Sequence, residues 1–157
     1  MSNSRPTIQL SEAKTCPTVT ATDIRSLVKS RTQRIRGVSS LFEQVAEGKF
    51  PVNIEGINSS FIGLLVQISP KTFGSPVIVV APTEQEAELL TSDLQLFSRE
   101  PRRIRHLPWW GLLPYSNVSP LPSVFGKRAS VLIDLVNNPT TIDVVVTSLR
   151  ALVTPIP

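Results

Sequence analysis

Two runs of β-branched residues stand out in the second half of the chain. Val77–Ala81 reads VIVVA, and Ile142–Ser148 contains three consecutive valines. Such runs are typical of parallel strands that are covered on both faces. Shorter stretches at Val52–Ile54 and Arg103–Leu107 predict two more strands.

Between the strands, apolar residues recur at helical spacing. Thr83 and Glu86 form a capping box at the start of one helix, where Glu84 also complements the helix dipole. The inward face of this helix consists of Ala87, Leu90, Leu94 and Phe97.

Three further helices are predicted, at Ser60–Ile68, which Pro70 ends, at Ser123–Val136 and at Leu149–Val153. Because strands and helices alternate, we expect an α/β fold of three layers, a parallel sheet of about four strands flanked by helices. No strand follows the final helix, so we expect an incomplete fragment of a longer protein.

The chain divides into three predicted segments. Residues 1–22 are polar and lack periodicity, and we expect a disordered leader there. Residues 23–48 form a basic helical segment that Gly37 divides and Gly48 ends, and residues 49–157 form the α/β module. The apolar stripe of the helical segment consists of Ile24, Leu27, Val28, Ile35, Val38, Leu41, Phe42 and Val45.

The turn after Val52–Ile54 has the spacing of a phosphate-binding loop. A working loop, GxxxxGK[ST], needs glycines for close approach of backbone N–H groups, a lysine for the β and γ oxygens, and a hydroxyl for Mg²⁺. With Gly56 as the first glycine, the other three positions hold Phe61, Ile62 and Gly63. An isoleucine cannot replace the ammonium charge, so we expect no catalysis, no cofactor and no metal here. This degenerate loop comprises Gly56, Ser59, Ser60, Phe61, Ile62 and Gly63.

Residues 107–122, LPWWGLLPYSNVSPLP, contain both tryptophans and the only tyrosine. The prolines and Gly111 exclude a long regular element, so the aromatic surface either packs on its own domain or meets a partner. We favour packing, because Leu112 and Leu113 resemble anchors.

Arg128 lies on the inward face of the Ser123–Val136 helix. A buried guanidinium needs partners, and the candidates are carbonyl groups of the preceding loop or a carboxylate such as Asp143. We therefore interpret Arg128 as a structural latch, with ligand contact as the alternative.

Composition limits the class of protein. The 157 residues suffice for one domain, 41% of them are hydrophobic, and no apolar run approaches the roughly 18 residues of a membrane span. Cys16 is the only cysteine and His106 the only histidine. An internal disulfide is therefore impossible, and a reducing cytosol is the simplest setting.

The net charge of +4 is unevenly distributed. Residues 1–50 carry eight Lys/Arg against four Asp/Glu, and residues 99–128 carry six against one. This balance permits contact with nucleic acid or an acidic partner, but we favour a solvated basic face. The candidate contacts are Arg25, Lys29, Arg36, Arg102, Arg103 and Arg105.

From about Val38 onward, the chain resembles the first module of the bacterial transcription-repair coupling factor, which is related to the repair protein UvrB. The resemblance rests on HLPWWGLLPYSNVSP, on the helix with Arg128, and on the strand and helix that read VVVTSLRALVTPIP. VIVVAPTEQEAELL adds a strand and a helix at the expected place.

The resemblance implies a non-catalytic scaffold module. UvrB has a working ATP site at the corresponding loop, whereas the first module of coupling factors has lost it. Only about a dozen residues separate Tyr115 from the Arg128 helix, too few for the damage-probing hairpin of UvrB. Structural or interaction roles would fall to Trp109, Trp110, Pro114, Tyr115 and Arg128.

The resemblance also implies what lies outside this chain. ATP and Mg²⁺ would belong to a DNA-translocase motor elsewhere in the coupling factor, in the bacterial cytoplasm. This module would contact the rest of that protein, while RNA polymerase, UvrA and double-stranded DNA would be bound by other parts.

Two other hypotheses remain open at this stage. The chain could be a P-loop NTPase fragment with an atypical loop, which would need Lys49 or Lys71 near the phosphates. It could also be a stand-alone nucleic-acid-binding module that uses its two basic clusters.

Overall fold

A parallel sheet of three strands forms the centre of the fold. The computed structural model describes residues 21–73, 76–112, 119 and 121–154. The strands β1 (Val77–Ala81), β2 (Ile104–Leu107) and β3 (Val144–Ser148) lie in the order β1-β3-β2. Val144 of β3 is in register with Val77 of β1 and with Ile104 of β2.

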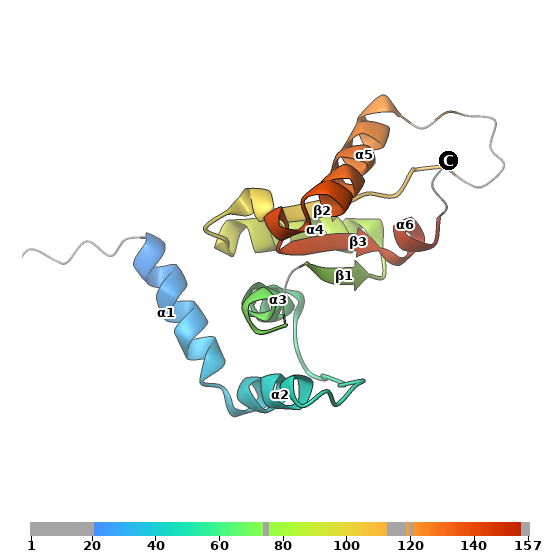
Figure 1. Ribbon diagram of the computed structural model, residues 1–157. Helices are drawn as coiled ribbons and strands as arrows, with labels where there is room; N and C mark the ends of the chain where they lie inside the picture. The colour runs from blue at the N-terminus through green and yellow to red at the C-terminus, as the bar shows by residue number, and fades with distance from the viewer. Residues whose placement is uncertain (1–20, 74–75, 113–118, 120, 155–157) are drawn as a thin grey trace, which may run out of the picture.

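Helices cover the two faces of this sheet, α4 (Glu84–Phe97) on one and α5 (Pro122–Asn137) on the other (Figure 1). The core on the α4 face consists of Ala81, Ala87, Leu90, Leu94, Ile104, Val144 and Val146, with Ile62, Val66 and Val79 packed against it. The core on the α5 face consists of Leu107, Val131, Ile142 and Val145, with Leu132 and Leu135 beside it. All five residues of β3 are buried, as expected for the central strand.

The helical predictions in this part of the chain are largely confirmed. Thr83 caps α4, its hydroxyl accepting a hydrogen bond from the Glu86 N–H. Helix α6 (Leu149–Val153) lies where predicted, and Ser148 caps it through a bond from the Ala151 N–H. Two short 3₁₀ helices, η1 (Pro101–Arg103) and η2 (Pro139–Thr141), precede β2 and β3.

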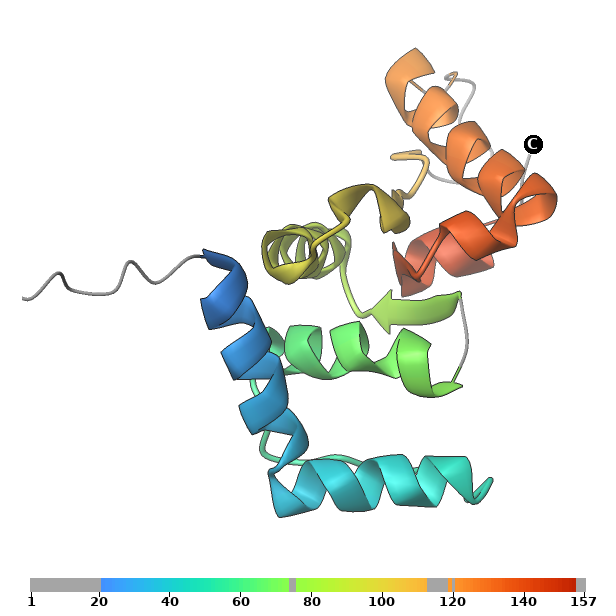
Figure 2. The same cartoon turned by 60° about the vertical axis from the view of Figure 1, so that its left-hand side comes forward.

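Three helices precede the first strand: α1 (Ala21–Gln33), α2 (Arg36–Ala46) and α3 (Ser59–Phe73). Figure 1 and Figure 2 show α3 beside the sheet, with α1 and α2 on its far side. The predicted division of the helical segment is confirmed, just before Gly37. Gly48, with φ of 73°, follows the end of α2.

The predicted strand at Val52–Ile54 is wrong. These residues have no ladder partner, and the described sheet has three strands rather than four. A strand needs a neighbour for its backbone groups, and this segment instead lies along α2 (Figure 2). Three residues in which apolar and polar side chains alternate can place their apolar side chains against a helix as well as in a sheet.

Two further expectations need correction. Pro70 does not end α3, which continues to Phe73; a proline so near the end of a helix removes only one late hydrogen bond. Strand β1 is covered on one face only, since Ile78 and Val80 are exposed. Helix α5 packs over β2, and its buried face meets β3 rather than β1.

The apolar stripe predicted for the basic helical segment is also only partly buried. Val38 is buried, but Ile24, Leu27 and Ile35 are exposed. Helix α1 meets α3 and α2 through few residues, so a stripe that has the spacing of a core face has little to pack against.

Candidate functional site

The degenerate phosphate loop does not follow a strand. Gly56 has φ of 72°, and Asn58 directly precedes α3, its side-chain oxygen accepting a hydrogen bond of 2.9 Å from the Phe61 N–H. The Asn58 carbonyl accepts a second bond, from the Ile62 N–H. Ser60 is exposed, and a Cβ on Gly63 would touch Leu90 of α4. The Asn58 side chain therefore already occupies one of the N–H groups in the first turn of the helix.

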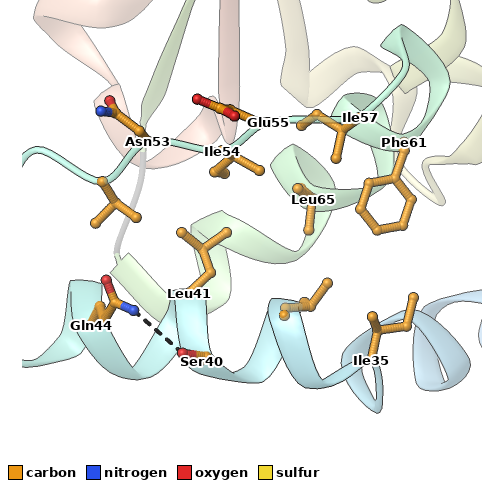
Figure 3. Close-up of a pocket in the computed structure, with 13 residues that line it drawn as sticks. Ile35, Ser40, Leu41, Gln44, Asn53, Ile54, Glu55, Ile57, Phe61 and Leu65 are labelled. Atoms are coloured by element: carbon orange, nitrogen blue, oxygen red, sulfur yellow. Dashed lines mark hydrogen bonds between the residues drawn. The ribbon is translucent and has the colours of Figure 1, made fainter.

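An apolar pocket of about 340 Å³ lies beside this loop, between α2 and residues 52–57 (Figure 3). Phe61 and Leu65 of α3 line it together with Leu41 of α2. Glu55 is the one charged residue among its lining residues. Figure 3 shows its carboxylate on the side of the segment that faces away from α2. The apolar wall disfavours a triphosphate, which needs cations and donors. Lys49, one candidate for the missing cation, is exposed and 2.7 Å from Glu47; the side chain of Lys71 lies outside the described residues.

The carboxyl edge of the sheet is the usual ligand site of an open α/β fold, and here Glu84 connects its parts. Glu84 Oε1 accepts a hydrogen bond of 3.0 Å from the Trp109 N–H, and Oε2 accepts one of 2.6 Å from the Ser148 hydroxyl. The carboxylate thus ties the start of α4 to the segment after β2 and to the last residue of β3.

His106 of β2 lies next to this carboxylate. Its Nε2 is 3.3 Å from Glu84 Oε1 but without hydrogen-bond geometry. Burial lowers the pKa of His106, as does the charge of Lys127, against the opposing effect of Glu84 and Glu88. Glu84, Glu88 and His106 place one ligand atom each within 4.8 Å of one another. Within this group, both oxygens of Glu84 accept hydrogen bonds from other segments of the fold.

Arg128 of α5 is buried, with 3% of its surface exposed. Its Nη1 donates a hydrogen bond of 2.6 Å to the Pro108 carbonyl and one of 3.4 Å to the Ala151 carbonyl. Burial lowers the pKa of the guanidinium, opposed by the charge of Glu84. The predicted latch to a carbonyl of the preceding loop is confirmed; the alternative partner, Asp143, instead pairs with Arg103 at 2.7 Å.

Both tryptophans take part in this arrangement. Trp110 is buried, with the Arg128 guanidinium 4.6 Å from its ring centroid. Trp109 is half-buried, and the Arg150 guanidinium of α6 lies 4.7 Å from its ring. The prediction that this aromatic segment packs on its own domain is confirmed for Trp110. Leu113, Pro114 and Tyr115 lie outside the described residues.

The predicted basic residues separate into three groups. Arg103 forms an ion pair with Asp143, and Arg105 forms one with Asp134. The hydrogen bond and the charge of Asp143 raise the pKa of Arg103. Arg36 and Arg102 are exposed on separate elements.

Arg25 and Lys29 of α1 belong to the third group. They line a polar pocket that also includes Arg99, at the far end of α4. Both are candidate nucleic-acid contacts, but the sequence does not predict that they and Arg99 line one pocket. Helical spacing could place Arg25 near Lys29, whereas nothing in the sequence brings Arg99 to them.

The sequence likewise does not predict the contacts of Glu84 with Trp109 and Ser148. The only local signal for these contacts is a glutamate in the first turn of a helix, which the helix dipole explains equally well.

In the part of the chain that the structure describes, none of the helices has both the length and the apolar composition that a membrane span requires. Compared with protein-family models and with curated proteins, the chain gives no match.

Proposed function

We propose that this chain is a non-catalytic scaffold, the first module of a transcription-repair coupling factor. The observation that carries the proposal is the closure of the carboxyl edge by the chain itself. Arg128 binds the carbonyl groups of Pro108 and Ala151, and Trp110 lies under its guanidinium. These are residues on which the family resemblance rests.

The closed edge leaves little place for a nucleotide. In an open α/β sheet, ligands enter at the carboxyl ends of the strands. Here Glu84 joins the ends of β2 and β3, and Arg150 covers Trp109. The carboxylate of Glu84 and the guanidinium of Arg128 are both used in internal hydrogen bonds.

The pocket beside the degenerate loop supports the same proposal. It is apolar, and Lys49 is paired with Glu47. A P-loop NTPase fragment would require a cation directed at that pocket, so the enzyme hypothesis has less support than the scaffold.

The link to coupling factors is tested by the coding sequence that follows the codon for Pro157. We expect an open reading frame that continues into the motifs of an ATP-dependent DNA translocase. A reading frame that continues into an unrelated domain, or a stop codon at that position, would contradict the link.

A further inference from the structure

The polar pocket between α1, α3 and the end of α4 is lined by three cations. Arg25 and Lys29 come from α1, and Arg99 follows α4. The pocket has a volume of about 280 Å³, and Ser26, Ser30, Gln33 and Gln67 add neutral polar groups. We propose that this pocket binds a phosphate group. The proposal is independent of the scaffold function.

All the charged residues in the lining are cations. No carboxylate is among the lining residues that the structure describes. Like charges gathered around one concave surface repel each other and focus the field into it. Binding a polyanion relieves that repulsion, and a phosphate oxygen accepts hydrogen bonds from arginine in a fork geometry that matches the guanidinium.

The half-buried Arg25 and the exposed Arg99 differ from Arg103 and Arg105, which each bind an aspartate. Between described side chains, no ion pair involves Arg25 or Arg99. Arg25 is half-buried and held by a bond of 3.4 Å to the Ser98 carbonyl, which keeps the guanidinium next to Arg99.

Gln67 is one of the neutral polar residues of the lining, and its side-chain nitrogen donates to the Leu94 carbonyl. The pocket therefore offers cations for the phosphate oxygens, surrounded by neutral polar groups.

Calorimetric titration of the full chain with inorganic pyrophosphate, at low salt of about 50 mM, tests the proposal. We expect saturable binding that Arg25→Gln and Arg99→Gln each weaken about tenfold or more, since one charge-assisted contact is lost. Arg102→Gln is the matched control, because it removes the same charge from an exposed site outside the pocket, and it should bind as the wild type does.

Two results would overturn the proposal: no saturable heat with pyrophosphate, or equal weakening by Arg99→Gln and Arg102→Gln. Should Arg25→Gln fail to fold, Arg99→Gln alone decides, because Arg99 is exposed. Fluorescence anisotropy with short labelled DNA distinguishes the source of the phosphate. Competition between DNA and pyrophosphate assigns the site to a nucleic-acid backbone, and pyrophosphate binding without DNA binding assigns it to a small phosphorylated molecule.

Discussion

Arg128 Nη1 donates a hydrogen bond of 2.6 Å to the carbonyl oxygen of Pro108, twenty residues earlier in the chain. This contact fastens α5 to the segment after β2. Because the same guanidinium reaches Ala151 and covers Trp110, one side chain joins three segments at the carboxyl edge of the sheet.

Replacing Arg128 should therefore destabilise the whole module. Arg128→Met leaves buried carbonyl groups without a donor, and we expect a loss of about 2–4 kcal/mol in the free energy of unfolding. Urea denaturation followed by tryptophan fluorescence measures it. Arg102→Met, at an exposed position, should leave the midpoint unchanged. Equal midpoints for both variants would show that the latch contributes nothing.

The α4 face of the core offers a matched pair of leucines on one helix. Leu94 is fully buried, whereas Leu96 is 64% exposed. Leu94→Ala should cost about 2–5 kcal/mol, because it removes buried methyl groups and leaves a cavity. Leu96→Ala should change the free energy of unfolding far less. Similar losses in thermal or urea unfolding would contradict the position of α4 over the sheet.

The cap of α4 gives a smaller effect. The Thr83 hydroxyl accepts a bond of 3.2 Å from the Glu86 N–H, so Thr83→Ala should lower the free energy of unfolding by about 1 kcal/mol. Ser92→Ala is a control, because Ser92 is exposed within the same helix. If the cap contributes nothing, Thr83→Ala and Ser92→Ala will have the same free energy of unfolding.

His106 makes stability depend on pH. Burial lowers its pKa in the folded state below the ordinary 6.5, so below pH 6.5 the unfolded chain takes up the proton first. Stability is then fully present above pH 6.5 and falls as the pH drops toward the folded-state pKa. The difference in unfolding free energy between wild type and His106→Asn should change over this window. A difference that stays constant from pH 7.5 to about pH 5 would rule out the shift.

The sequence predicted those elements whose signals are local. The valine runs of β1 and β3, the Thr83 cap and the limits of α6 need only neighbouring residues, and the structure confirms them. Arg128 was also predictable, because a charge on the inward face of a helix needs a partner.

Elements that depend on distant contacts were not predictable. Val52–Ile54 has the pattern of a strand, but whether it joins a sheet depends on where α2 lies. Ile78 and Val80 look like core residues until the extent of α5 is known. The meeting of Arg25 with Arg99 is a tertiary contact with no trace in either local sequence.

The scaffold proposal is tested most directly by nucleotide binding in a chain whose polar pocket has been disabled. ATP with Mg²⁺ is titrated by calorimetry into the Arg25→Gln/Arg99→Gln double variant, so that any remaining binding must come from elsewhere. We predict no saturable heat. A saturable isotherm with a micromolar Kd, lost on Lys49→Ala, would show a working nucleotide site and contradict the scaffold.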